Sequence, residues 1–384
     1  MPRKICVLVT ARPSYARIRS VLTAIDRHPD LELQLVLAGS ALLARYGGIE
    51  ETVEDDGFQV AAKVHFVVEG GTPLTSAKTT GLALLEISSA LDILQPDVIV
   101  TVADRFETIA TALAAVNMNI PLAHVQGGEV TGNIDDKIRH AVTKLADIHF
   151  VAHQLAYERV IKMGEDESAV FNTGCPSIDV AKAAIASSNG NFDPFEHYGG
   201  VGPTIRSADP YAVVLQHPVT DAVDHAQSQV EETLHAIHDS GLQAFWFWPN
   251  IDAGSDGTSK GIRQFREAHP EAPIHFFRGM RPEHFIRLIN ESAVLVGNSS
   301  AGIREASYLG VPAIDIGTRQ SGRLKGPNVV NTTPDRHQIL TAIREQIGQV
   351  RPDPVSLYGD GGAGEKIAEV LVSTPLRTTK KLTY

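Results

Sequence analysis

The chain has 384 residues, 43% of them hydrophobic, which is enough for two ordinary domains that each bury a core. Its formal net charge is -11, from 45 acidic and 34 basic residues, which argues against a nucleic-acid partner or an anionic membrane surface. The two cysteines, Cys6 and Cys175, lie far apart without a CxxC pair, and no segment approaches the roughly 20 apolar residues of a membrane span. We therefore expect a cytoplasmic protein that binds neither nucleic acid nor membrane.

Apolar runs alternate with longer amphipathic segments along the whole chain. This pattern is typical of parallel β/α units, because strands that are covered on both faces need not alternate in polarity. The first five predicted strands are KICVLV (4–9), LQLVLA (33–38), DVIVTV (97–102), PLAHV (121–125) and HFVAH (149–153). The next five are YAVVLQ (211–216), LQAFWFW (242–248), PIHFF (273–277), AVLVGN (293–298) and VPAIDIG (311–317).

Residues 186–210 divide these two groups of strands, since they concentrate Gly, Pro, Ser and Asp and lose the periodicity. We therefore predict an α/β fold with two Rossmann-like domains, residues 1–185 and 211–362, joined by this linker. A last amphipathic segment within residues 363–384 predicts a helix and a tail.

Polar residues follow the predicted strands in both halves. In open α/β sheets, ligands bind beyond the carboxyl ends of the strands, so these residues are candidates for a binding site. In the first half they are Arg12, Ser14, Asp104, Arg105, Gln126 and Glu129, and in the second half His217, Asn250, Asp252, Asn298, Ser299 and Ser300. Two such sets predict a cleft between the domains.

The stretch GNSSAGIRE (297–305) predicts a strand, a turn and the start of a helix. Amides and hydroxyls at a helix amino terminus suit a diphosphate, and Glu305 could accept hydrogen bonds from ribose hydroxyls. The competing interpretation, that Ser299 or Ser300 caps a helix, is favoured on this stretch alone. The loop GTRQSGRLKGPN (317–328) shifts the balance, because Arg319 and Arg323 match phosphate oxygens.

The stretch HVQGGEVTGNIDDKIRH (124–140) holds the densest group of ionisable residues. In a helix, Asp135 would neighbour Arg139, and Asp136 would neighbour His140, as in an ordinary surface ladder of salt bridges. Alternatively, these aspartates join Glu129 and Asp104 in a crevice, where neighbouring carboxylates can serve as acid and base. Both interpretations are open at this point.

Several cofactor signatures are missing from the sequence. No GxGxxG follows the first strand, and neither GxxxxGK[ST] nor HExxH occurs. We therefore expect no cofactor and no metal.

Taken together, these stretches resemble the hydrolysing UDP-N-acetylglucosamine 2-epimerases of the sialic-acid pathway. The matching motifs are TARPSYARI (10–18), ADRFET (103–108), GGEVTGNIDDKIRHAVTKLAD (127–147), GCPSID (174–179), QHPVT (216–220), PNIDAGS (249–255), GNSSAGIREA (297–306) and GTRQSGRLKGPNV (317–329). The resemblance implies a GT-B-like pair of domains with an interdomain cleft, the sugar held mainly by the first and UDP by the second, and a carboxyl-terminal helix that packs toward the first. It also implies a homo-oligomer, a dimer or tetramer.

For the site, the resemblance implies that a base removes the C2 proton as UDP departs, leaving a 2-acetamidoglucal, to which water then adds. By position, Asp104, Asp135 and Asp136 would supply the acid and base groups. The UDP ligands would be Arg12, His217, Ser299, Ser300, Glu305 and Arg319. Two positions depart from the family: Gln126 stands where members carry a glutamate, and Ser14 where they often carry an aspartate. A glutamine cannot accept a proton, so Glu129 or the aspartates would do that work, or the substrate differs.

Three alternatives to a UDP-N-acetylglucosamine epimerase are open at this stage. The substrate could be a UDP-2,4-diacetamido-2,4,6-trideoxyhexose. The chain could instead be a GT-B glycosyltransferase, which needs an acceptor and leaves the C2 proton in place, or a nucleotide-sugar sensor with weakened chemistry. The retention of Asp104, Asp135 and Asp136 argues against the sensor.

Overall fold

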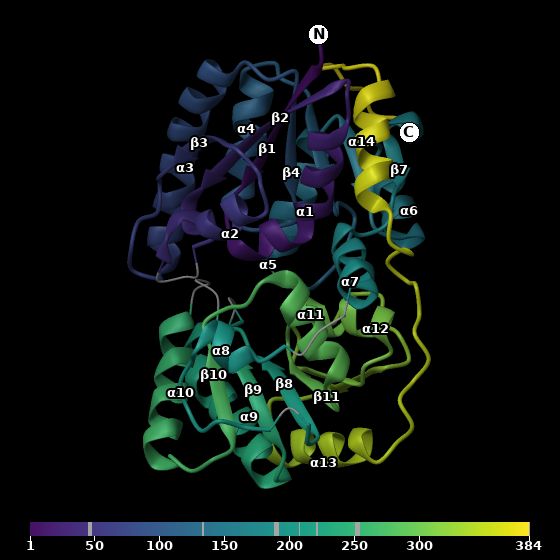
Figure 1. The fold of residues 1–384 in the computed structure, drawn as a ribbon. Coiled ribbons are helices and arrows are strands. Elements are labelled where there is room, and N and C mark those ends of the chain that lie inside the picture. Colours follow the sequence, from purple (N-terminus) through teal and green to yellow (C-terminus); the bar gives the residue numbers. More distant parts are fainter. Residues whose placement is uncertain are drawn as a thin grey trace. The chain divides into compact units, whose positions relative to one another are not determined.

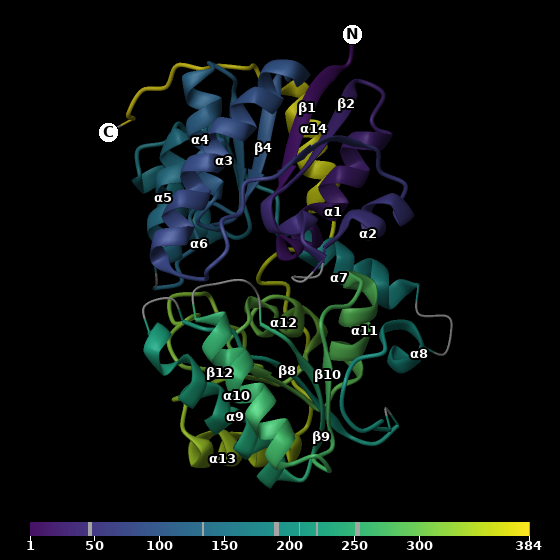
Figure 2. The same cartoon turned by 90° about the vertical axis from the view of Figure 1, so that its left-hand side faces the viewer.

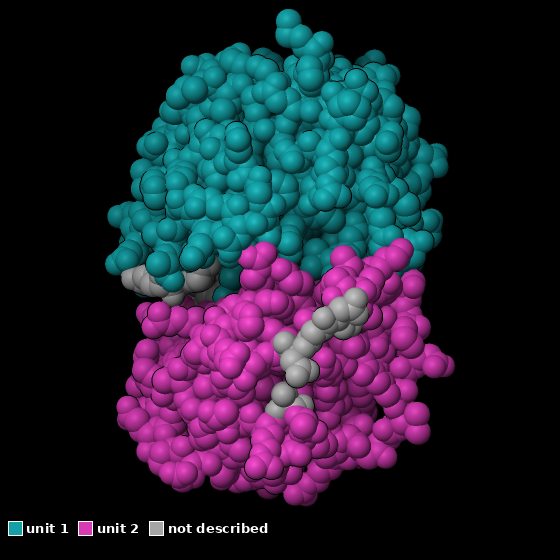
Figure 3. Space-filling view, viewed as in Figure 1, with its two compact units in different colours: residues 1–130, 134–180, 358–384 teal, residues 131–133, 181–357 magenta. Residues whose placement is uncertain are grey.

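The computed structural model describes residues 1–44, 48–132, 134–187, 192–206, 208–219, 222–249 and 254–383. The chain forms two compact units, one of residues 1–130, 134–180 and 358–384 and the other of residues 131–133 and 181–357 (Figures 1 and 3). Both are α/β units built on a parallel sheet, which confirms the predicted fold class.

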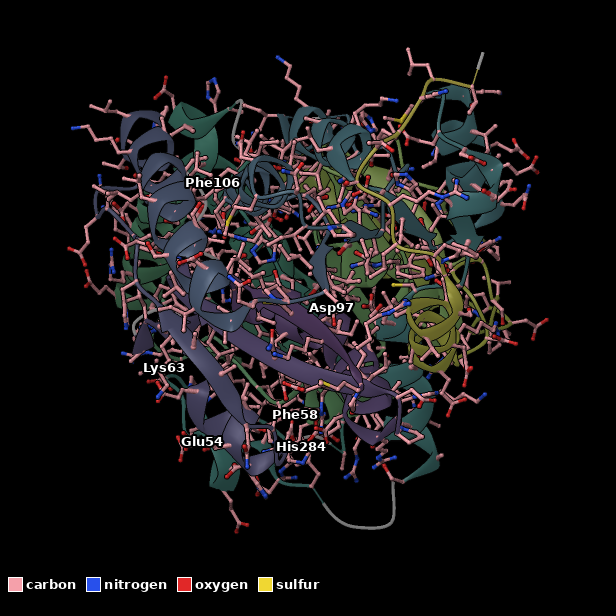
Figure 4. The ribbon with its side chains drawn as sticks, turned by 90° about the horizontal axis from the view of Figure 1, so that it is seen from above. Glu54, Phe58, Lys63, Asp97, Phe106 and His284 are labelled. Atoms are coloured by element: carbon pink, nitrogen blue, oxygen red, sulfur yellow. The ribbon has the colours of Figure 1, made fainter. Side chains whose placement is uncertain are left out.

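The sheet of the first unit has the order β3-β2-β1-β4-β5-β6-β7. Its strands, within the described residues, are β1 (Arg3–Val9), β2 (Leu31–Ala38), β3 (Val60–Val64), β4 (Val98–Val102), β5 (Leu122–Val125), β6 (Ile148–Val151) and β7 (Val170–Asn172). The central strands are nearly continuous apolar runs because helices cover both faces, with separate hydrophobic cores on the two sides. At the amino end of β4, Asp97 accepts a hydrogen bond of 2.8 Å from the backbone N–H of Lys4 in β1 (Figure 4).

Helices of the first unit pack on both faces of this sheet. They are α1 (Arg12–Arg27), α2 (Glu50–Asp55), α3 (Pro73–Leu94), α4 (Thr108–Asn117), α5 (Ile134–Leu145), α6 (Gln154–Lys162), the first part of α7 (Pro176–Ala186) and α14 (Ala363–Ser373). One face carries α1 and α14, and the other carries α3, α4 and α5 (Figures 1 and 2).

The last helix, α14, belongs to the first unit although the second unit precedes it in the sequence. It packs on α1, and Gly364 lies so close to the carbonyl oxygen of Ser20 that a Cβ would meet it at 2.5 Å. Asp179 accepts hydrogen bonds from the backbone N–H groups of Gly362 and Gly364, each at 2.7 Å. The aspartate of the GCPSID motif therefore holds the amino terminus of α14.

The tail after α14 is anchored in the first unit by Glu165. Glu165 is 2% exposed. Its carboxylate lies 2.5 Å from Nζ of Lys380 and of Lys144 and 3.0 Å from Nε2 of His149. Burial opposes ionisation, but the three donors prevail and lower the pKa of Glu165 to about 2. As the pH falls below 4.5, the ordinary pKa of a glutamate, this carboxylate takes up a proton in the unfolded chain but stays ionised in the folded chain.

The free energy of unfolding should therefore decrease as the pH falls through the range set by the lowered pKa of Glu165. We expect the wild-type protein to lose stability progressively as the pH falls from about 4.5 to about 2, and Glu165→Gln to lack this part of the loss. Urea unfolding at a series of pH values measures it. Glu167→Gln, on an exposed neighbour, is the control, and parallel curves for Glu165→Gln and the wild type would contradict the prediction.

The sheet of the second unit has the order β10-β9-β8-β11-β12-β13. Its described strands are β8 (Tyr211–Leu215), β9 (Gln243–Phe247), β10 (Ile274–Phe277), β11 (Val294–Gly297), β12 (Ala313–Ile316) and β13 (Val329–Thr332). Its helices are the end of α7, α8 (Pro194–Tyr198), α9 (Ala226–Ser240), α10 (Ser255–Ala268), α11 (Pro282–Glu291), α12 (Glu305–Leu309) and α13 (Arg336–Ile347). The predicted linker, 186–210, contains α8, and its residues 188–191 and 207 lie outside the described ranges.

Each of the ten predicted strands is present, and β6 ends two residues earlier than predicted because His153 instead caps α6. The prediction missed β3, β7 and β13, which lie at sheet edges. None of the helices that the structure describes is long and apolar enough to cross a membrane.

Candidate functional site

The candidate residues of the first half all follow strands of the first sheet. Arg12 and Ser14 begin α1 after β1, Asp104 and Arg105 follow β4, and Gln126 follows β5. Because the strands are parallel, these positions lie at one edge of the sheet, which we call the first rim.

Asp104 is held at the first rim by an unusual backbone turn. The preceding residue, Ala103, has φ +63°, a left-handed conformation that side chains disfavour, and its N–H donates to the carbonyl of Val125 at 2.9 Å. The Ala103 carbonyl lies 2.9 Å from Nε2 of His124. Since a carbonyl only accepts, Nε2 carries the proton. Burial lowers the pKa of His124 to about 3, so the ring is neutral and acts as a fixed hydrogen-bond donor.

Arg139 gathers candidate groups from three parts of the first rim. Its guanidinium is 1% exposed and binds the carboxylates of Asp104 and Asp136, and Nη1 also donates to the carbonyl oxygen of Glu129 at 2.7 Å. Burial favours a lower pKa for Arg139, but the aspartates raise it above its ordinary value, so the guanidinium stays charged. The same attraction favours the ionised form of both carboxylates.

This geometry decides between the two interpretations of residues 124–140. Asp136 pairs with Arg139, three residues on, and a buried guanidinium cannot belong to an exposed ladder of salt bridges. Asp135 and Asp136 lie in the first turn of α5, where the helix dipole favours negative charge. A second cation also approaches Asp104, with Arg17 Nη1 3.7 Å from Oδ1. The carboxylates of Asp104 and Asp136 therefore meet at a buried guanidinium and do not form an exposed ladder.

The two glycines of this stretch are required by close packing. Gly128 has φ +73°, and a Cβ there would lie 2.4 Å from the carbonyl oxygen of Ala156. A Cβ on Gly127 would lie 2.9 Å from Oγ1 of Thr143. Glu129, which follows them, is 2% exposed, so the turn draws its carboxylate into the interior of the first unit.

Gln126, at the position where the family pattern has glutamate, is 2% exposed and has φ +68°. Its Nε2 lies 2.9 Å from Sγ of Cys175, which lies 3.0 Å from Oγ of Ser177. The amide therefore connects the first rim to the start of α7 as a hydrogen-bond donor.

Replacing Gln126 with glutamate should consequently harm this protein. We expect Gln126→Glu to destabilise it by about 1–3 kcal/mol and to give no gain in turnover, because the donor toward Cys175 is lost in a buried site. Thermal unfolding and initial rates would measure this. Gln154→Glu, at an exposed position, is the matched control, and a faster Gln126→Glu enzyme of unchanged stability would contradict the expectation.

Arg12, Ser14 and Arg105 complete the first rim. Desolvation lowers the pKa of Arg12, and Ser14 is buried. Arg105 lies 5.6 Å from the centre of the Phe106 ring, and its Nε donates to Glu107 at 2.8 Å. Glu107 is 2% exposed, and its other carboxylate oxygen is buried and accepts no hydrogen bond from the residues that the structure describes.

The second sheet has a corresponding edge, the second rim, where His217 follows β8 and Asn298 follows β11. The Asn298 side chain accepts from the N–H of His217 and donates to its carbonyl, both at 2.8 Å. Gly297, with φ +137°, permits this approach, since a Cβ would lie 2.0 Å from the carbonyl oxygen of Leu215. Asn298 is fully buried, so its role is to fix the backbone around His217.

The serine turn after β11 is tighter than predicted. A short 3₁₀ turn, Ser300–Gly302, precedes α12, which begins at Glu305. Ser299 caps the 3₁₀ turn by accepting from the N–H of Ala301 at 3.3 Å, as the capping interpretation predicts, and Ser300 accepts from Arg304 at 2.7 Å. One carboxylate oxygen of Glu305 is buried and accepts no hydrogen bond within the described part of the chain, and Arg304 Nε lies 3.9 Å from it.

The loop 317–328 brings its arginines to the same rim. Arg319 Nη1 and Gln320 Nε2 both donate to the carbonyl of Asn298, at 3.2 and 2.9 Å, and Arg323 Nε donates to Gln320 at 2.7 Å. Lys325 holds the loop to the sheet through Asp315, at 2.9 Å. His217, Asn298, Arg319 and Arg323 are thus brought together, while the remaining candidates Asn250 and Asp252 lie outside the described residues.

The sequence interpretation missed four residues that organise these rims: His124, Arg139, Arg304 and Gln320. His124 and Arg139 lie in the stretch 124–140, Arg304 is next to Glu305, and Gln320 is next to Arg319. Their roles depend on contacts with other strands or turns, so position within the motif was the one available signal.

Comparison with known proteins finds relatives that match most of the chain. The family model described as UDP-N-acetylglucosamine 2-epimerase matches residues 23–372. A UDP-N,N'-diacetylbacillosamine 2-epimerase (hydrolyzing) of Legionella pneumophila is 30% identical over 98% of each chain, and a UDP-N-acetylglucosamine 2-epimerase of Neisseria meningitidis is 30% identical over 97% of this chain and 95% of that protein.

The fold also matches solved structures. The UDP-GlcNAc 2-epimerase of Methanocaldococcus jannaschii, solved with UDP-GlcNAc and UDP, superposes with a TM-score of 0.79 at 17% identity, over 96% of this chain and 99% of that one. The match of the family model over most of the sequence, together with the bacterial relatives, shows that this chain belongs to the UDP-N-acetylglucosamine 2-epimerase family.

Proposed function

We propose that this protein is a hydrolysing 2-epimerase that converts UDP-N-acetylglucosamine, or a closely related UDP-HexNAc, and water to N-acetylmannosamine and UDP. The observation that carries the proposal is that the carboxylates of Asp104 and Asp136 meet at buried Arg139, beside the backbone carbonyl of Glu129, at one edge of a sheet. Such an arrangement supplies ionised carboxylates fixed in position for proton transfer. Family membership supports an epimerase over a GT-B glycosyltransferase or a sensor.

The proposed reaction has two steps. A carboxylate of the first rim takes the C2 proton as the C1–O bond to UDP breaks with its electron pair, which leaves a 2-acetamidoglucal. Water then adds across the double bond, its oxygen to C1 and a proton to C2 on the opposite face, which gives the manno sugar. Asp104, held in its ionised form, is our choice of base, and Glu129, Asp135 and Asp136 are the remaining candidates for acid and base.

The second rim is the proposed UDP site. Arg319 and Arg323 supply positive charge beside the Asn298 turn, and guanidinium groups match phosphate oxygens. Glu305 offers a buried carboxylate oxygen for a ribose hydroxyl to donate to. Arg12, Ser14, Arg105, His217, Ser299 and Ser300 are the other proposed substrate ligands, and the site needs no metal or cofactor.

UDP binding should depend on Arg319. We expect Arg319→Ala to weaken UDP binding about 10- to 100-fold, because a charge-assisted hydrogen bond to phosphate contributes roughly 1.5–3 kcal/mol. Calorimetric titration with UDP measures the loss. Arg266→Ala, on α10 and stacked 5.5 Å from the Phe276 ring, is the matched control, and equal UDP affinity in Arg319→Ala and the wild type would refute the assignment.

The second candidate substrate is UDP-N,N'-diacetylbacillosamine, a UDP-2,4-diacetamido-2,4,6-trideoxyhexose. The Legionella relative is named for this sugar nucleotide. Parallel reactions with this sugar nucleotide and UDP-GlcNAc in deuterium oxide, followed by phosphorus and proton NMR, test both. Release of UDP with deuterium at C2 of the free sugar establishes hydrolysing epimerisation, and the larger kcat/KM identifies the substrate. Tight UDP binding without release of UDP from either substrate would overturn the proposal.

A further inference from the structure

His124, in β5, contacts two different parts of the first rim through its two ring nitrogens. Nε2 lies 2.9 Å from the carbonyl oxygen of Ala103, and Nδ1 lies 3.1 Å from Oγ1 of Thr143 in α5. Both His124 and Thr143 are fully buried. Oγ1 of Thr143 also lies 3.0 Å from the carbonyl oxygen of Arg139, one helical turn earlier. We call the contacts from Ala103 through His124 to Thr143 the histidine bridge.

The histidine bridge and the buried ion pair close a ring of contacts. The guanidinium of Arg139 binds the carboxylate of Asp104, and the backbone of Arg139 meets Thr143. From Thr143 the bridge leads through His124 to the residue that directly precedes Asp104. Asp104 is therefore linked to α5 twice, once by its carboxylate and once by its backbone. Such supporting hydrogen bonds hold a functional side chain more closely than a single ion pair does.

The protons of the histidine bridge can be placed from its neutral charge. Burial lowers the pKa of His124 to about 3, so the ring carries one proton, and the carbonyl of Ala103 requires it on Nε2. Nδ1 is then an acceptor, and within the described ranges Thr143 is the donor that meets it. The carbonyl of Arg139 already accepts the backbone N–H of Thr143 in the α-helical pattern of α5, so the hydroxyl proton is better used at Nδ1.

Gly127 leaves room for the hydrogen bond between Thr143 and His124. A Cβ on Gly127 would lie 2.9 Å from Oγ1 of Thr143 and 3.1 Å from Nδ1 of His124. The φ of Gly127 lies outside the left-handed region, so these contacts, and not backbone strain, oppose a side chain. The first glycine after Gln126 therefore packs directly against the histidine bridge.

We propose that Thr143 is a positioning residue of this site, because its hydroxyl holds the ring of His124 and the ring holds the turn that carries Asp104. Thr143 acts through His124 and not on the substrate itself. The inference rests on the proposed function, in which Asp104 takes the C2 proton. A catalytic group that is misplaced by about 1 Å can lose about 100-fold in rate, so a small opening of the bridge should be visible in turnover.

Thr143→Val tests this role, because valine has nearly the shape of threonine but no hydroxyl. We expect kcat to fall about 10- to 100-fold, with the UDP affinity of the wild type, since the residues of the second rim are unchanged. Thr143→Ser keeps the hydroxyl and should retain most of the turnover. Thr111→Val is the matched control, because Thr111 is also fully buried and its hydroxyl makes no hydrogen bond to the residues that the structure describes.

Gly127→Ala opens the histidine bridge from its other side. Its Cβ should push Thr143 away from His124 and cause a similar loss of kcat. Gly81→Ala is the control, since a Cβ at Gly81 in α3 would meet no atom within 4 Å. Circular dichroism and the melting temperature show whether each variant is folded. Wild-type kcat in folded Thr143→Val or in folded Gly127→Ala would overturn the proposal.

Nitrogen NMR of the wild-type protein examines the histidine bridge without any turnover. We expect a proton on Nε2 of His124 at neutral pH, and an Nδ1 resonance that shifts in Thr143→Val because its hydrogen bond is lost. A proton on Nδ1 instead would overturn the proposal.

The two measurements together separate this inference from the proposed function. A wild-type protein that has the expected ring proton but releases no UDP from either sugar nucleotide would overturn the proposed function, and with it a role of Thr143 in turnover. A wild-type protein that releases UDP, with a kcat that Thr143→Val leaves unchanged, would overturn the inference on Thr143 alone.

Discussion

An Asp104→Asn variant should lose about 100- to 10,000-fold in turnover while binding UDP almost as tightly as the wild-type protein. Asparagine preserves the shape of the side chain but cannot take up a proton. The wild-type carboxylate is held at the end of β4 by buried Arg139, with Arg17 3.7 Å from its other oxygen. Initial rates of UDP release, incorporation of deuterium at C2 and a UDP titration measure the three quantities separately.

Asp97→Asn is the matched control for this experiment. It is the same substitution at the opposite end of β4, where the carboxylate accepts a hydrogen bond from the N–H of Lys4. We expect this control to turn over normally. Normal turnover by Asp104→Asn would remove Asp104 from the mechanism, whereas a parallel loss of UDP affinity would make it a binding residue.

Replacing Arg139 should affect both stability and catalysis. Arg139→Met leaves the carboxylates of Asp104 and Asp136 facing an apolar side chain, and breaking a buried ion pair from one side destabilises by about 3–5 kcal/mol. Arg139→Lys keeps the charge but loses the fork that binds three acceptors at once. We expect Arg139→Lys to fold and to turn over at least about 10-fold more slowly, with UDP affinity unchanged.

The pH profile separates a positioning role from a merely structural one. A lysine that interacts less closely with the carboxylate of Asp104 lowers the pKa of this group less than arginine does. The acid limb of the kcat profile should therefore move to higher pH in Arg139→Lys. Arg159→Lys is the matched control, since Nη1 of Arg159 donates to a backbone carbonyl, that of Gly128, at 3.3 Å. Full turnover of Arg139→Lys, with the acid limb of the wild type, would refute the role of Arg139.

Most of the fold could be predicted from the sequence because the central strands are covered on both faces. Their apolar runs, such as β4 with every residue buried, are visible without knowledge of any partner. The missed strands are edge strands. β3 alternates between exposed and partly buried residues, β7 has three residues, and β13 is largely accessible, so their hydrogen bonding to a neighbour, rather than their composition, makes them strands.

The candidate site could be predicted only in part. Asp104 and Arg319 were identified because they follow strands within recognisable motifs. The position of Gln126 was also noted. Its contact with Cys175 could not be predicted, because the two residues lie 49 positions apart in the sequence. Arg139 was considered only as the helical neighbour of Asp135, in one of two open interpretations, since spacing along a helix does not reveal burial.

The sequence by itself determined the parallel α/β architecture, the positions of most strands along the chain and the ends at which polar residues follow them, because hydrophobic periodicity and turn chemistry act locally. Only the tertiary structure decided which of these polar groups meet. The buried guanidinium of Arg139 joins groups that follow β4 and β5 with the first turn of α5, and the carboxylate of Asp179 joins α7 to α14. Such contacts depend on packing between distant segments, and burial then turns ordinary charged residues into fixed and strongly interacting ones.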